Sequence, residues 1–127
     1  MPRPAQDDPR LVRLTKLCLA LPEATCERSG RHATFRVRTK TFAYFLDNHH
    51  GDGIVALAWR TARGENRDWV AAEPSRFFMP AYIGPRGWAG LRLDVGPIDW
   101  REVEGFVRDS YRLAAPKRLA TTVAPIE

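Results

Sequence analysis

Three strand-like runs follow one another between residues 33 and 59, and they restrict the possible fold more than any other feature. The run "ATFRVR" (33–38) alternates apolar and polar residues, "TFAYFL" (41–46) is rich in aromatic residues, and "IVALAW" (54–59) is almost continuously apolar. Thr39 and Lys40 can form a tight turn between the first two runs. Strands joined by tight turns pair antiparallel, so this region predicts an antiparallel sheet.

Amphipathic helices are predicted at both ends of the chain. Apolar side chains recur at three- and four-residue spacings from residue 11 to residue 21, Asp7 or Asp8 can cap the first turn, and Pro22 ends the helix. A second, longer pattern fills residues 100–115 and stops before Pro116. Here Asp99 is the expected cap, and Glu102 stands three residues later, as in a capping box.

The remaining segments complete one α+β domain. "ATCERSGRH" (24–32) is ambiguous as a strand, "ENRDWVAAEP" (65–74) offers one or two helical turns, and "WAGLRLD" (88–94) alternates again. We expect a single domain over residues 1–127, with its core at about 8–116 and a flexible tail at 117–127. The predicted architecture has two layers, with four to five antiparallel strands and the N- and C-terminal helices on one sheet face.

The chain is basic, with a formal net charge of +5 and an isoelectric point near 9.8. Such a balance favours nucleic acid, an anionic membrane or an acidic partner. Only three of the 20 basic residues are lysines, and a GC-rich genome would explain that bias equally well. No apolar run reaches the length of a membrane span, and the N-terminus lacks an apolar signal core, so we expect a cytoplasmic protein.

No catalytic, cofactor or metal motif is recognisable, so a non-enzymatic protein without a cofactor is expected. Asp47, His49, His50 and Asp52 in "DNHHGDG" do not have the spacing of a calcium loop, and a solvated turn accounts for them better than a metal site. Cys18 and Cys26 have no partner spacing for metal or redox chemistry and are expected to be reduced thiols.

The first candidate site is the basic hairpin. On a strand, Arg36 and Arg38 would share one face, with Lys40 at the tip, and residues 28–40 contain no acid. Such a ribbon can follow DNA phosphates, with Lys117 and Arg118 as the next choice. Alternatively, the cations guard an exposed strand against aggregation, and Lys117 and Arg118 stabilise a helix C-terminus.

The second candidate is the stretch "YIGPRGWAG" (82–90). Tyr82, Arg86 and Trp88 could form an aromatic-lined site that stacks a base or holds a small anion. In the structural alternative the aromatic residues plug the end of the sheet, together with Phe77 and Phe78. Glycines 84 and 87 would then supply bends, and glycine 90 would let a ring approach.

Several motifs, taken in order, resemble the MmcQ/YjbR family of small bacterial proteins. They are "LPEATCE", "HATFRVRTKTFAYF", "EPSRFFMPAYIGPRGWAGLRLD" and "DWREVEGFVRDSYRLAAPKRL", and together they span about residues 10 to 119. The segment "RTARGENRDW" (60–69) departs from the more regular acidic helix common among relatives.

The resemblance implies a two-layer α+β fold similar to that of secretion chaperones. It also implies a DNA-binding function, because some members have been likened to a phage double-wing domain. It supplies no catalytic residues. The expected function is therefore a non-enzymatic DNA-binding module with weak sequence specificity. The alternative is a protein- or small-ligand-binding module that uses the sheet face and the Tyr82–Trp88 loop.

Overall fold

The sheet in the computed structural model, which describes residues 8–124, is built from six antiparallel strands in the order β1-β2-β3-β4-β6-β5. The strands are β1 (Ala24–Ser29), β2 (His32–Val37), β3 (Lys40–Asp47), β4 (Val55–Arg60), β5 (Phe77–Phe78) and β6 (Trp88–Arg92). The helices are α1 (Pro9–Leu19), α2 (Glu65–Ala72), α3 (Trp100–Ala114) and α4 (Lys117–Ala120), with short 3-10 turns η1 (His49–Gly51) and η2 (Gly84–Arg86).

The six strands exceed the four to five that were expected, and the two edge strands explain the difference. No residue of strand β1 is fully buried, and its sequence shows no clear alternation of apolar and polar residues from which a strand could be predicted. Strand β5 has only two residues, too few for any periodic pattern. The antiparallel pairing and the α+β class are as predicted.

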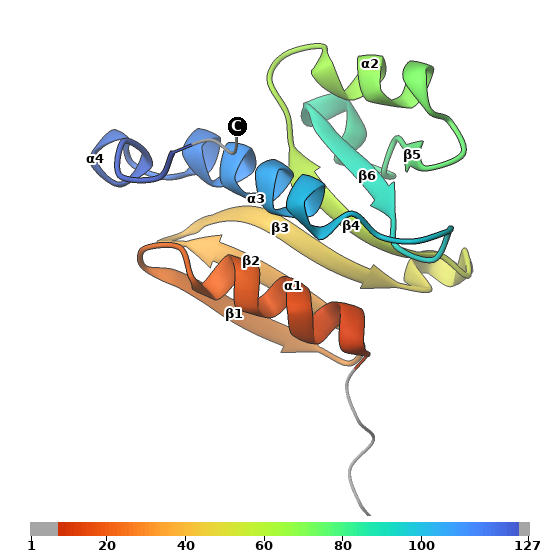
Figure 1. Cartoon of the computed structure of the whole chain (residues 1–127), viewed down its shortest axis with the longest axis horizontal. Helices are drawn as coiled ribbons and strands as arrows, with labels where there is room; N and C mark the ends of the chain where they lie inside the picture. The colour runs from red at the N-terminus through yellow and green to blue at the C-terminus, as the bar shows by residue number, and fades with distance from the viewer. Residues whose placement is uncertain (1–7, 125–127) are drawn as a thin grey trace, which may run out of the picture.

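Helices α1 and α3 cover one face of the sheet, as Figure 1 shows, and this confirms the expected two layers. The core beneath them is aromatic: the ring of Trp59 on β4 stacks on that of Phe106 on α3, with 4.1 Å between centroids. Trp69 of α2 contacts both Phe106 and Phe77, with centroids 5.0 and 5.1 Å away. Helix α2 therefore closes the same core at the β5–β6 edge of the sheet.

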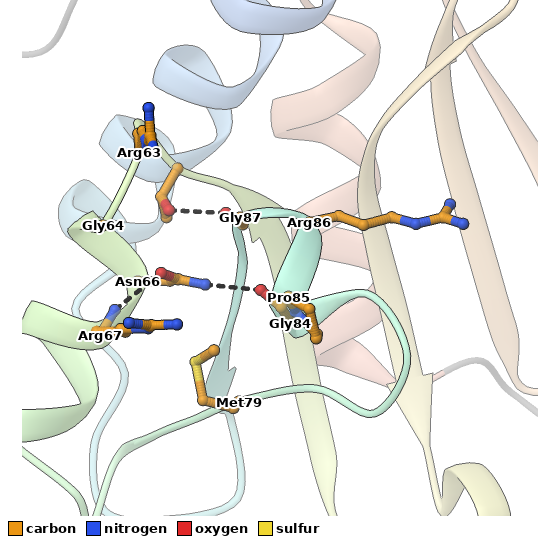
Figure 2. Close-up of a pocket in the computed structure, with 10 residues that line it drawn as sticks. Arg63, Gly64, Asn66, Arg67, Met79, Gly84, Pro85, Arg86 and Gly87 are labelled. Carbon is orange, nitrogen blue, oxygen red and sulfur yellow. Dashed lines mark hydrogen bonds between the residues drawn. The ribbon is translucent and has the colours of Figure 1, made fainter.

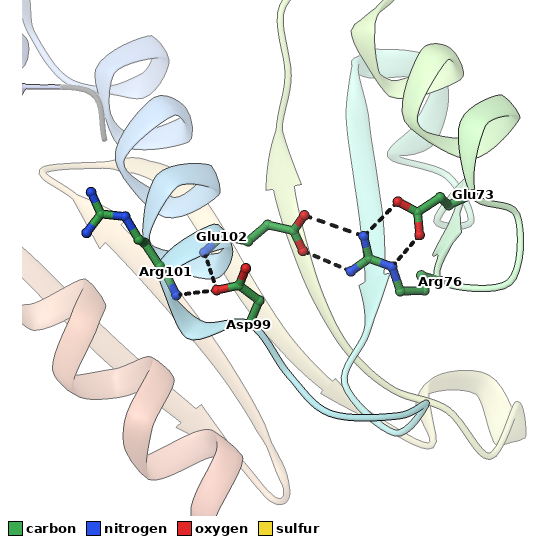
Figure 3. Close-up of polar contacts among 5 residues, drawn as sticks. All are labelled: Glu73, Arg76, Asp99, Arg101 and Glu102. Atoms are coloured by element: carbon green, nitrogen blue, oxygen red, sulfur yellow. Dashed lines mark hydrogen bonds and ion pairs between the residues drawn. The ribbon is translucent and has the colours of Figure 1, made fainter. Parts of the chain in front are cut away.

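The two long helices begin at the aspartates that the sequence indicated. The Asp8 carboxylate accepts from the Arg10 amide, and the Asp99 carboxylate accepts from the amides of Arg101 and Glu102. The Glu102 carboxylate, expected to complete a capping box, accepts instead from Arg76 at 2.9 Å (Figure 3). Asp7, the other candidate cap, lies outside the described residues.

Arg76 connects two parts of the fold that are distant in sequence (Figure 3). Its guanidinium lies between Glu73, which follows α2, and Glu102 on α3, at 2.7 and 2.9 Å. These hydrogen bonds raise the pKa of Arg76 above its ordinary value. The pairing fixes the segment that carries β5 against the start of α3, and so supports the β5–β6 edge.

A β-bulge interrupts the β2–β3 ladder, and Ser110 of α3 satisfies the groups around it. Phe35 pairs with Ala43 and Arg36 with Thr41, so Phe42 has no partner on β2. The buried Ser110 hydroxyl donates to the Phe42 carbonyl and accepts from the Arg60 amide at 2.8 Å. One side chain thus completes the hydrogen bonding where strands β3 and β4 diverge.

We expect the Ser110→Ala substitution to lower the free energy of unfolding by about 1–3 kcal/mol, because it leaves a buried amide and a buried carbonyl without a partner. Urea unfolding followed by tryptophan fluorescence measures the change. The exposed Ser75→Ala substitution is the control and should alter stability by less than about 0.5 kcal/mol. Equal stability of the two variants would mean that the hydroxyl is not needed at the bulge.

Beyond residue 116, in the segment where a flexible tail was expected, the structure describes a short helix and a buried side chain. Helix α4 follows Pro116 directly, and Val123 is buried at 5% exposure among core residues. No periodic apolar pattern in residues 117–124 predicted the burial of Val123. Residues 125–127 lie outside the described part. In residues 8–124, no helix combines the length and apolarity that crossing a membrane requires.

Candidate functional site

The predicted basic hairpin forms, but its two arginines are neutralised by acids from the neighbouring strand and turn. Arg36 pairs with Glu27 at 3.1 Å, and Arg38 pairs with Glu23 at 3.0 Å. The ion pair with Arg38 lowers the pKa of Glu23. Residues 28–40 indeed contain no acid, but the edge strand β1 brings in carboxylates from just outside that range.

Arg38 also occupies a different position from the one expected. Val37 pairs with Lys40, so Arg38 and Thr39 form the two-residue turn, and Arg38 has a φ of 56°. Its side chain therefore leaves a turn, whereas Arg36 projects from a strand. The second pair of predicted cations, Lys117 and Arg118, is exposed on α4, and the charge of Arg118 contributes to lowering the pKa of Glu23.

Lys40 is the predicted hairpin cation that faces a pocket. This cationic pocket has a volume of about 280 Å³ and lies on the outer face, the sheet face opposite α1 and α3. Lys40, Arg60 and Arg86 line it, together with Thr39, Thr41, Tyr44, Ile83 and Trp88. The Arg60 guanidinium donates to the Thr41 carbonyl at 2.9 Å, which holds it at the end of the hairpin.

A second basic pocket, of about 510 Å³, adjoins the first at Arg86 (Figure 2). Arg63 and Arg67 line its α2 side, and the 84–87 turn forms the opposite wall. Figure 2 shows the Arg86 side chain extending away from Arg63 and Arg67, on the far side of that turn. Arg86 lines both pockets, so the cations form one band around the turn.

Buried hydrogen bonds fix the turn that separates the two pockets (Figure 2). The Asn66 amide group, 4% exposed, donates to the carbonyls of Gly84 and Trp88 at 2.9 and 3.0 Å. The Thr61 amide and hydroxyl both donate to the Gly87 carbonyl, at 2.8 and 2.7 Å. Gly87 has a φ of 97°, a backbone conformation that side chains disfavour. The pocket walls are therefore preorganised.

The five cations Lys40, Arg60, Arg63, Arg67 and Arg86, which we call the cationic band, line the two basic pockets, and Arg60 also borders a separate pocket with Glu65 and Asp109. Neither pocket is lined by an aspartate or a glutamate. Within residues 8–124, the ion pairs join other arginines to carboxylates and leave these five unpaired. Concave surfaces with one sign of charge concentrate counter-ions, so this band is suited to bind anions.

Of the residues of the second candidate, Arg86 and Trp88 line the cationic pocket, whereas Tyr82 lines a different, third pocket. Trp88 begins β6, is 4% exposed, and packs against Tyr44 with ring centroids 5.1 Å apart. The Arg60 guanidinium lies 5.3 Å from its ring, in a cation–π contact. Trp88 is thus a largely buried wall of the cationic pocket.

Tyr82 is not packed at the end of the sheet, where the structural alternative placed it. It is 82% exposed and lines a third pocket with His32 and His49. Phe77, in contrast, is buried as expected. The approach of a ring to Gly90 is confirmed: a Cβ there would lie 2.5 Å from the Phe78 ring.

The "DNHHGDG" segment folds as a turn held by its own side chains. The Asn48 side-chain oxygen accepts from the Gly53 amide at 2.7 Å, and the Asp52 carboxylate accepts from the Ile54 amide at 2.9 Å. Among the side chains that the structure describes, which do not include that of His50, acids, histidines and cysteines do not gather in a group of three or more that could hold a metal. Cys18 is buried, Cys26 is half-buried, and both are free thiols.

Sequence reasoning missed Arg60, Arg63 and Arg67. Their segment, residues 60–69, was noted only as a departure from the acidic helix common among relatives. Its three arginines at three- and four-residue spacings were the available signal. Their convergence with Arg86 depends on the pairing of β4 with β6, in which Arg60 lies opposite Trp88.

Comparisons with known proteins agree on the fold and the family. Among curated proteins, none matches the chain. The crystal structure of the Deinococcus radiodurans protein DR2400, described as a family-model domain DUF419, has a TM-score of 0.68 to this structure. It shares 16% sequence identity, and the match covers 88% of this chain and 86% of that one. The YjbR family model matches residues 19–113, three quarters of the sequence. The chain therefore belongs to the YjbR family.

Proposed function

We propose that this YjbR protein is a non-enzymatic DNA-binding module that contacts the phosphate backbone with weak sequence specificity. The cationic band carries the proposal, because five unpaired cations surround one preorganised turn on a concave surface. Guanidinium groups suit phosphate oxygens, since their planar N–H donors form paired hydrogen bonds. A DNA partner would place this activity in the cytoplasm.

The composition of the band supports contacts to the backbone over reading of bases. Four of its five members are arginines on different elements: Arg60 ends β4, Arg63 and Arg86 lie in turns, and Arg67 is on the short helix α2. They therefore do not project together from one element that could enter a groove. Asn66, the amide side chain nearest to them, is buried and fully engaged with the turn, so it is not available to read adenine. Binding should therefore depend little on sequence.

A protein-docking function receives less support. The exposed large apolar side chains are spread over separate elements: Val12 and Leu19 on α1, Met79 and Tyr82 before η2, and Leu113 on α3. Docking surfaces are usually contiguous apolar patches of several hundred Å².

We expect single-stranded DNA to bind with a dissociation constant of about 1–100 μM near physiological salt, as for non-specific binding. If all five cations contact phosphates, the logarithm of the binding constant should fall against log salt with a slope of about −3 to −4. Fluorescence anisotropy over a salt series measures both values, with unrelated oligonucleotide sequences as the specificity control. Absence of binding at low salt would contradict the proposal.

A further inference from the structure

The outer face holds a third pocket, of about 300 Å³, which adjoins the cationic pocket. Tyr44 and Ile83 line both cavities, so the two share a wall. The third pocket, which we call the aromatic pocket, is otherwise lined by His32, His49 and Tyr82, with Thr34, Leu46 and Ala81. Planar rings and short apolar side chains dominate this lining, whereas guanidinium and ammonium groups line its neighbour.

The walls of the aromatic pocket are held in place by local contacts. His32 and His49 meet edge to face, with 5.3 Å between their centroids. The Nε2–H group of His32 donates to the Asp47 carbonyl at 3.0 Å, since a carbonyl can only accept. This hydrogen bond fixes the orientation of the His32 ring in the wall of the aromatic pocket.

Tyr82 projects from a strained turn. The Ile83 amide donates to the Ala81 carbonyl at 2.8 Å, which closes a three-residue turn around Tyr82. Tyr82 has a φ of 67°, a region that large side chains seldom adopt. Strain of this kind is typical of residues that clamp ligands. Here the strained turn places an aromatic ring, 82% exposed, at the edge of a pocket.

We propose that the two pockets form one site for a single unstacked nucleotide, with its base against Tyr82 and its phosphate at Lys40, Arg60 and Arg86. This inference rests on the proposed DNA binding and specifies the form of DNA that is bound. A base in a duplex is stacked and paired, and turning it out costs a few kcal/mol. An unpaired base can enter the aromatic pocket without that cost, so the site favours single strands. A free nucleoside phosphate has the same two groups, a base and a phosphate, and is the other possible source of the nucleotide.

Stacking of one base on an aromatic side chain contributes about 1–3 kcal/mol, which corresponds to about 5- to 150-fold in affinity. We therefore expect a short single-stranded oligonucleotide to bind at least about fivefold more tightly than the duplex of the same sequence. Tyr82→Ala should remove this preference by weakening only the single strand. Tyr82→Phe, which keeps the ring, should retain it. Leu113→Ala, an exposed apolar change on α3, is the control and should leave both affinities unchanged.

Competition separates the two sources of the nucleotide. Displacement of the single strand by adenosine monophosphate, but not by inorganic phosphate or adenosine, would show that one free nucleotide fills the site. No displacement, together with a preference that depends on Tyr82, would show that the nucleotide must belong to a strand. If the duplex binds as tightly as the single strand, or Tyr82→Ala weakens both equally, the nucleotide site is wrong while DNA binding stands. If neither form binds, the DNA-binding proposal itself fails.

Discussion

The Trp88→Ala variant is expected to unfold with a free energy about 3–5 kcal/mol below that of the parent protein. The ring is 4% exposed and lies against the ring of Tyr44 and the guanidinium group of Arg60. Its removal leaves a cavity at the start of β6, beside the carbonyl that Asn66 holds. The surroundings can collapse only partly, since β6 pairs with β4 at Trp88 and with β5 at Gly90 and Leu91.

Equilibrium unfolding in urea measures this loss, and Tyr82→Ala provides a matched control. Tyr82 is an aromatic residue of the same segment but is 82% exposed, so its truncation should change stability by less than about 0.5 kcal/mol. A Trp88→Ala variant that unfolds at the same urea concentration as the parent would show that the ring is not packed. Trp88 would then have to be considered a ligand-binding residue as well.

Removal of three cations from the band, in Arg63→Ala/Arg67→Ala/Arg86→Ala, is expected to weaken single-stranded DNA binding by about 100-fold or more at 0.1 M salt. The figure follows from a salt slope of about 0.7 to 0.9 for each phosphate contact, which is about five- to eightfold in affinity per cation. The same variant should flatten the slope by about two to three units. The three side chains have no ion pair within residues 8–124, so the folded state loses little.

A control with the same loss of charge separates the band from net charge. Lys16→Ala/Arg31→Ala/Arg112→Ala removes three exposed cations, from α1, the β1–β2 turn and α3. This control should keep most of the affinity and the slope. Arg36→Ala/Arg38→Ala should also have a smaller effect per cation, because Glu27 and Glu23 already neutralise those side chains. Equal losses in all three variants would mean that only total charge matters.

The sequence was sufficient for features that depend on neighbouring residues. The caps at Asp8 and Asp99, the hairpin and the two layers follow from local pattern and turn chemistry, although the turn falls at residues 38–39 and not at the predicted 39–40. Gly90 was also predictable, because a glycine inside a strand commonly marks the close approach of another group, here the Phe78 ring.

The features that the sequence could not supply depend on strand order. Glu23 and Glu27 neutralise the hairpin only because β1 pairs with β2, and β1 shows too little burial to be recognised as a strand. Arg60 and Arg86 meet only because β6 lies beside β4, with α2 and β5 inserted between them in sequence. Long-range pairing therefore decided which cations are free to bind a ligand.

Amide NMR of isotope-labelled protein, titrated with a short single-stranded oligonucleotide, would locate bound DNA directly. The cationic band and the aromatic pocket predict shift changes in residues 38–41, 60–67 and 82–88, which lie apart in sequence and meet around the 84–87 turn. Shift changes confined to α1 and α3, which cover the opposite face, would contradict DNA binding at this site.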